Sequence, residues 1–295
     1  MARTGYQLIS PSPWPISTAF SVMGLCTSLF IFASEGLTSV FWGVCVFSIF
    51  FTAFNMCNWW SDVVMESTHL GEWSSYVLRT YVWGFRFFIL SEAFFFASLF
   101  GSFIYASLGE TSIQGVGFWP PRGIKPLHPG KVALLNTGVL VGSSLTANWA
   151  LRCVKAHNLI PYGETFLVSS GLGNKEKRAT SLSYQVEGLF SLGLTILLGV
   201  IFTYLQSQEY YWSSFSFADG ICGSIFYLLT GFHGLHVIIG TIFLSVCWLR
   251  LYFLHFSYKH FYFGMWAAVW YWHFVDGIWI VVYFMVYVWG HWGYS

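Results

Sequence analysis

The chain has 295 residues, of which 56% are hydrophobic and 22% aromatic, and its formal net charge is +1. Only 8% of the residues are charged, against about 25% in a soluble domain. This shortfall excludes a soluble enzyme, a disordered chain and a nucleic-acid-binding protein that relies on a basic patch. The composition instead predicts an integral membrane protein whose side chains are solvated largely by lipid.

Seven apolar stretches are long enough to cross a bilayer as helices. A membrane helix needs about 20 apolar residues, whereas a barrel strand has about 10 residues of alternating polarity, a pattern that these stretches lack. A stretch rich in Ser, Gly, Lys and Thr, 158–185, is expected to be a polar insertion loop. The predicted fold is all-α, a single membrane domain over 1–295 with helices at 16–34, 38–60, 77–108, 132–156, 186–206, 220–254 and 262–290.

Lys and Arg residues are unevenly distributed between the two ends of these helices. Nine of them lie on the side of the N-terminus and three on the opposite side. Positive charge accumulates on the inner side of a membrane. The sequence therefore predicts an N-terminus inside and, after seven spans, a C-terminus outside.

Glu92 lies within the third predicted helix, between Phe87-Phe88 and Phe94-Phe95-Phe96. Charges inside membrane spans are costly, so each one is a functional hypothesis. A carboxyl group surrounded by phenylalanines favours its neutral form. Two interpretations stay open: a proton-modulating site, or a structural carboxyl that hydrogen-bonds a neighbouring helix. Arg86 lies about 240° around the helix from Glu92, so the two are not expected to pair.

Histidines in the sixth and seventh predicted helices offer a possible ligand set. His233 and His236 share one helical face, and with His273 they are candidates for haem or metal ligation. His273 and Asp276 are expected to bond each other or the sixth helix. Hydrogen-bonded packing is the favoured interpretation, because the same segment carries glycines typical of close helix contacts, Gly231, Gly234 and Gly240.

Short motifs are spread over the chain from residue 11 to about 290. The more general ones are Pro11-Ser-Pro-Trp-Pro15, Trp59-Trp60 with Asp62 and Glu66-Ser-Thr68, Ser91-Glu92, Trp119-Pro-Pro121, Leu134-Leu-Asn-Thr137 and Leu205-Gln206 with Glu209-Tyr210. The two most specific are Thr230-Gly-Phe-His-Gly-Leu-His-Val-Ile-Ile-Gly240 and Trp270-Tyr-Trp-His-Phe-Val-Asp276. By these motifs and their order, the chain resembles the cytochrome c oxidase subunit III family of the haem–copper oxidases.

The resemblance implies an accessory subunit of respiratory complex IV. Its helices would form a group of two and a group of five around a V-shaped cleft filled with phospholipids. The chain itself would hold no cofactor or metal, since haem and copper belong to partner subunits. It would dock on subunit I and support proton uptake, an oxygen and lipid pathway, and thereby electron transfer from cytochrome c to oxygen. Cytochrome c would be only an indirect partner, and nucleic acid none.

The resemblance also places the chain in the mitochondrial inner membrane, with its N-terminus on the matrix side and its C-terminus in the intermembrane space. It makes Glu92 the family's buried carboxylate. It further implies phospholipid headgroup contacts at the ends of helices, for which the candidates are Trp60, Glu66, Arg250 and His255. The chain departs from the family's usual polar residues at Ser61, Met65, Trp73 and Trp266.

Two interpretations from other functional classes remain open. One is a haem-binding membrane electron carrier that uses His233, His236 and His273. The other is a stand-alone proton or solute transporter that uses Glu92. The transporter needs an inverted repeat or helices broken by Gly and Pro in matching halves, and the sequence shows neither.

Overall fold

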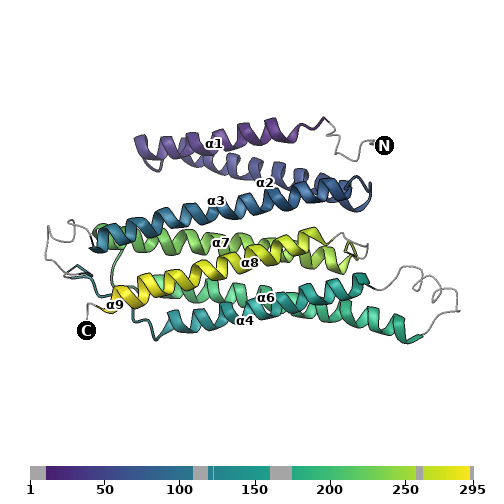
Figure 1. The fold of residues 1–295 in the computed structure, drawn as a ribbon. Coiled ribbons are helices and arrows are strands. Elements are labelled where there is room, and N and C mark those ends of the chain that lie inside the picture. The colour runs from purple at the N-terminus through teal and green to yellow at the C-terminus, as the bar shows by residue number, and fades with distance from the viewer. Residues whose placement is uncertain (1–10, 109–118, 122, 160–174, 257–261, 293–295) are drawn as a thin grey trace. The chain divides into compact units, whose positions relative to one another are not determined.

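The computed structural model of the chain describes residues 11–108, 119–121, 123–159, 175–256 and 262–292 (Figure 1). Within these ranges the regular structure is helical, with no strand, so the all-α prediction is confirmed. α8 continues without a break into a π-helical segment and a last turn. The elements are α1 (Trp14–Glu35), α2 (Ser39–Thr68), α3 (Ser75–Leu108), α4 (Val132–Leu159), α6 (Lys175–Tyr211), α7 (Gly220–Tyr252), α8 (Phe263–Val282), η2 (Tyr283–Trp289) and α9 (Gly290–Trp292).

Six of the long helices in the described part of the chain are long and apolar enough to cross a membrane. The seventh, α4, carries more polar side chains. Three of these, Asn136, Ser143 and Ser144, are buried in the protein, so they face neighbouring helices and not lipid. The chain is therefore a multi-pass membrane protein, and the polarity of α4 reflects its packing against other helices.

Two predicted boundaries are wrong. α2 does not end at Trp60 but continues to Thr68, because an aromatic pair marks the membrane interface without interrupting backbone hydrogen bonds. The expected loop 158–185 is helical from Lys175 onward, where α6 begins. Residues 175–185 are polar but contain no Gly or Pro, so nothing in their composition interrupts a helix. Residues 160–174 lie outside the described ranges.

The chain divides into two compact units, residues 1–82 and 83–295, with the division inside α3. In the first unit α1 and α2 form a helical hairpin. Gly36, with φ of 76°, ends α1, and Thr38 begins α2 by accepting a hydrogen bond from the Phe41 backbone N–H at 3.2 Å. A positive φ strains residues that carry a Cβ but not glycine, which explains the residue at this turn.

The interior of this hairpin is polar, while its exterior is apolar. Ser17 Oγ donates to Asn55 Oδ1 at 3.1 Å, and a side-chain atom added at Gly24 would collide with Ser48. The small residues let the two backbones approach closely, and the hydrogen bond joins the helices where lipid offers no partner. Large side chains point outward, among them Phe20, Phe30, Phe47 and Phe50, each more than half exposed.

In the second unit α4 lies beside α6, and α7 lies beside α8 (Figure 1). Trp272 of α8 fills the centre of this bundle and is fully buried. Its ring occupies the space that side chains would need at Gly199 of α6 and Gly240 of α7, where an added Cβ would lie 2.7 Å and 3.0 Å from the ring. Trp272 Nε1 also donates to Ser143 Oγ of α4 at 2.8 Å. One tryptophan therefore joins four helices.

Candidate functional site

Glu92 of α3 meets His236 of α7 inside the second unit. Glu92 Oε2 lies 2.9 Å from His236 Nε2, and His236 Nδ1 lies 2.7 Å from the Phe232 carbonyl oxygen. The His236 side chain is 11% exposed and the Glu92 side chain 25%. The helix thus presents Glu92 to a neighbouring helix, the contact expected if this residue is a structural carboxyl.

The geometry gives each ring nitrogen of His236 a hydrogen-bond partner. A carbonyl oxygen only accepts hydrogen bonds, so His236 Nδ1 must carry a hydrogen and donate to Phe232. The contact between Nε2 and Glu92 then holds one shared proton. That proton belongs either to the imidazolium or to the carboxylic acid, and both arrangements leave the pair without net charge. A neutral pair is what the low-dielectric interior of a membrane span favours.

Aromatic rings surround this pair on two sides. The Phe96 ring meets His236 edge-on at a centroid distance of 5.0 Å, and Tyr271 of α8 stacks on it at 6.3 Å. Arg86 takes no part, since its guanidinium group lies over the Trp83 ring at 4.8 Å. The prediction that Arg86 and Glu92 point to different faces is consistent with this placement.

The structure gives the three candidate histidine ligands separate environments. His233 is 1% exposed and bonds the Val275 carbonyl oxygen through Nε2 at 3.1 Å, and its ring packs between Phe202 and Trp279. His236 bonds Glu92, and His273 faces α4. Among the described residues, no three His, Cys, Asp or Glu side chains are placed to hold a metal ion. The geometry therefore favours hydrogen-bonded packing for these residues.

His273 and Asp276 are linked through α4. They do not bond each other or α7, the sixth predicted helix, as expected. Ser144 Oγ donates to Asp276 Oδ2 at 2.6 Å and lies 3.1 Å from His273 Nδ1. Asn148 Oδ1 lies 3.1 Å from His273 Nε2. The expectation was wrong because the rotation of α8 turns this face toward α4. Ser144 and Asn148 were not singled out from the sequence, where they are ordinary polar residues in an apolar run.

A second polar chain, also not singled out as a site from the sequence, links α4, α6 and η2. Asn136 Nδ2 donates to Gln206 Oε1, Gln206 Nε2 donates to the Tyr287 hydroxyl, and Tyr287 donates to Glu209 Oε2, at 3.2, 3.2 and 2.9 Å. Glu209 is only 7% exposed. The sequence signal was the motif around Gln206 and Glu209, but nothing local pointed to Tyr287, which lies 78 residues from Glu209.

The candidate lipid contacts lie in both units. In the first unit, Trp60 is 57% exposed on α2, and Asp62, one turn before Glu66, accepts a hydrogen bond from Trp14 Nε1. In the second unit, the Arg250 guanidinium group lies over the Phe256 ring at 4.7 Å. His255 closes the end of α7 through its backbone N–H, which donates to the Arg250 carbonyl oxygen at 2.9 Å.

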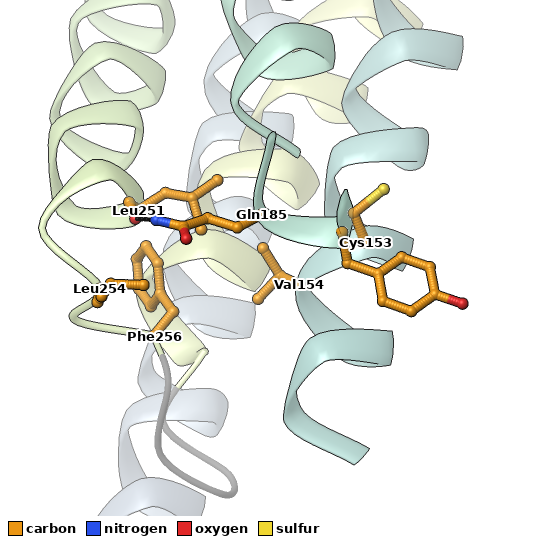
Figure 2. A pocket seen from close by; sticks show the side chains of 7 residues that line it. Cys153, Val154, Gln185, Leu251, Leu254 and Phe256 are labelled. Carbon is orange, nitrogen blue, oxygen red and sulfur yellow. Dashed lines mark hydrogen bonds between the residues drawn. The ribbon is translucent and has the colours of Figure 1, made fainter. Parts of the chain in front are cut away.

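A small apolar pocket adjoins the end of α7 (Figure 2). Leu251, Leu254 and Phe256 line one side, and Cys153 and Val154 of α4 line another. Gln185 of α6 donates from Nε2 to the Leu251 carbonyl oxygen at 3.4 Å. Phe256 therefore contacts a cationic side chain on one side and lines a small apolar pocket on another.

Comparison with known proteins agrees with the motifs and the fold. The family model of cytochrome c oxidase subunit III matches residues 4–173 and 164–291. Cytochrome c oxidase subunit 3 of Oryctolagus cuniculus is 40% identical over 270 residues, and that of Mus musculus 42% over 268 residues. The subunit 3 of Tetraodon nigroviridis is 41% identical, and each alignment covers 90% of both chains. The chain belongs to the cytochrome c oxidase subunit III family and is thus a subunit of that oxidase.

Proposed function

We propose that the chain is a cofactor-free accessory subunit of mitochondrial complex IV that supports proton uptake and oxygen reduction by subunit I. The observation that carries this proposal is the Glu92–His236 pair, which holds one shared proton inside a membrane span. Such a pair exchanges a proton between two groups without placing a net charge in lipid. It is suited to modulating protonation in a neighbouring protein, and it requires no redox centre in this chain.

Glu92→Gln tests this role in the assembled oxidase. Glutamine keeps a hydrogen bond to His236 but cannot exchange the proton, so we expect an intact complex with a modest change in turnover and proton uptake. Glu35→Gln, at the end of α1, is the matched control and is expected to leave both rates unchanged. Complete loss of oxygen reduction with haem retained would contradict the accessory role. Proton transport by the isolated chain in vesicles would favour the transporter instead.

We further propose that Arg250 and His255 bind the headgroup of an anionic phospholipid whose acyl chain lies along the apolar surface at the end of α7. The support is the shared Phe256, which lies under the guanidinium group and lines the small apolar pocket there. Cationic side chains at helix ends attract anionic headgroups. Trp60 and Glu66 are proposed to contact headgroups at the first unit, where Trp60 is the more exposed anchor.

Arg250→Gln should remove a tightly bound anionic phospholipid from the purified oxidase, measured by mass spectrometry of extracted lipid per haem. Lys125→Gln removes the same charge from an exposed loop position and is expected to leave the lipid content unchanged. An unchanged lipid content in the Arg250 variant would contradict the headgroup assignment.

The cationic residues also support a matrix-side N-terminus and a C-terminus in the intermembrane space, in the mitochondrial inner membrane. Nine Lys and Arg residues lie on the proposed matrix side and three on the other. This asymmetry is the positive-inside pattern. The lipid-filled cleft between a group of two helices and a group of five is part of the same proposal, supported by family membership.

A further inference from the structure

Tyr271 of α8 lies beside the Glu92–His236 pair and is buried, with 4% of its surface exposed. Its ring is nearly parallel to the imidazole of His236, with centroids 6.3 Å apart and planes 20° apart. Offset stacking of this kind is a preferred arrangement of two aromatic rings. The contact is made by the face of the Tyr271 ring, so it does not depend on the hydroxyl group.

A second ring extends this stack back to α3. Phe88 stacks on Tyr271 at a centroid distance of 6.3 Å, with 17° between the planes. Phe88 lies one helical turn before Glu92 on α3. α3 therefore reaches the pair by two routes, through the Glu92 carboxyl group that contacts His236 and through the Phe88 ring that contacts Tyr271.

The backbone of α7 fixes the position of the Tyr271 ring. Gly240 lies one turn after His236 on α7, and a Cβ added there would lie 3.3 Å from Tyr271 Cε1. The glycine thus leaves the ring room to pack directly against the helix. A ring held by a helix backbone gives its neighbour a fixed surface, because a packed helix moves less than a free side chain.

The orientation of the imidazole decides how well the pair shares its proton. Two hydrogen bonds fix the ring nitrogens, at 2.7 Å to the Phe232 carbonyl oxygen and 2.9 Å to Glu92 Oε2. The plane through those nitrogens is set by the neighbouring rings, Tyr271 parallel to it and Phe96 edge-on at 63°. Hydrogen bonds weaken steeply when the donor points away from its acceptor. A tilt of the imidazole would therefore weaken its contact with Glu92.

We propose that Tyr271 is a positioning residue for the Glu92–His236 pair. Its ring holds the imidazole in the plane that directs Nε2 at Glu92, and it acts only through His236. The inference rests on the proposed function for the role of the pair in proton uptake. It adds the residue by which α8 orients a proton-sharing contact between α3 and α7.

Infrared spectroscopy of the assembled oxidase tests this orientation. The signal of Glu92, as carboxylic acid or carboxylate, is identified by its loss in Glu92→Gln. Tyr271→Leu removes the stacked ring and should shift that signal, whereas Tyr271→Phe keeps the ring and should leave the signal in place. Trp270→Leu removes a 54% exposed ring from the same helix and is the matched control, expected to cause no shift. An unchanged Glu92 signal in Tyr271→Leu would overturn the inference.

Phe88→Leu provides the same test where Tyr271→Leu does not assemble. Phe88 is 45% exposed, so its replacement disturbs the packed interior less, and Tyr271 stays in place. The stack loses one ring, and the Glu92 signal should shift in the same direction by a smaller amount. A signal at the wild-type position would overturn the inference in that case.

Rates of proton uptake and oxygen reduction show whether Tyr271 acts through the pair. Tyr271→Leu should slow them by no more than Glu92→Gln does, and the double variant should match Glu92→Gln alone. Effects that multiply in the double variant would mean that Tyr271 acts independently, and would overturn the inference. Wild-type rates in Glu92→Gln would instead contradict the proposed function, while the infrared test would still decide the position of the imidazole. Haem content is measured on the same samples.

Discussion

At the scale of single residues, buried polar groups are bonded to residues far away in the sequence. Glu92 pairs with His236 at a separation of 144 residues, and Ser144 with Asp276 at 132. In lipid there is no water to satisfy such groups, so each one selects a particular neighbouring helix. These contacts therefore determine which helices pack together and in what rotation, in addition to any role in proton exchange.

The Tyr287 hydroxyl provides a test of this stabilisation. Tyr287→Phe removes the hydroxyl that donates to Glu209, so the buried Glu209 carboxyl group loses this hydrogen bond. We expect the free energy of unfolding to fall by about 1–2 kcal/mol, measured by thermal denaturation of the purified oxidase. Tyr283→Phe is the control four residues earlier in the same segment, where the hydroxyl makes only a long contact of 3.4 Å to the Pro129 carbonyl oxygen. Equal losses in the two variants would contradict the role of Glu209.

At the scale of helices, packing in the second unit depends on a large ring meeting small residues. Trp272 is accommodated because Gly199 and Gly240 lack side chains. The hairpin of the first unit reaches close contact differently, through Gly24 facing Ser48. In both cases the helices approach closely because van der Waals packing replaces the hydrophobic driving force that lipid removes.

Gly199→Ala tests the fit around Trp272. The added methyl group would lie 2.7 Å from the ring and 2.8 Å from Thr241 Oγ1, so the helices must separate. We expect a loss of about 1–3 kcal/mol in unfolding free energy. Gly193→Ala, on the same helix, places its methyl 3.5 Å from Trp248 and should be neutral or stabilising. Thermal denaturation of the purified oxidase measures both variants. A thermal unfolding midpoint for Gly199→Ala at or above that of Gly193→Ala would show that the bundle tolerates the methyl group.

At the scale of the whole molecule, the proposed orientation rests on the distribution of charge and not on packing. Cysteine introduced at Lys125 is expected to react with an impermeant maleimide added to the intermembrane-space side of the membrane. Cysteine at Arg79 should react only after the membrane is opened to the matrix. Both positions are exposed in the structure, so protein burial does not protect either one. The reverse pattern of labelling would contradict the proposed topology and place the N-terminus in the intermembrane space.

Much of the fold was predictable from the sequence alone. Low charge and long apolar runs predict membrane helices because lipid requires every span to be apolar and to satisfy its own backbone hydrogen bonds. The errors lay at helix ends, as at Lys175, where water permits helix and loop alike and composition does not choose between them. The position of Glu92 inside a span was also evident from the sequence.

The partners of the site residues were decided only by the tertiary structure. His236 was visible as a histidine, but its bond to Glu92 depends on how α3 and α7 are rotated against each other. His273 and Asp276 were expected to bond each other or the predicted helix 220–254. Because α8 turns this face toward α4, both of them bond Ser144 instead. Sequence periodicity is a property of one helix, whereas a hydrogen bond between helices depends on the relative rotation of two. For this reason the sequence determined the membrane class and placed Glu92 and the histidines within helices, and only the packed bundle decided which side chains those residues meet.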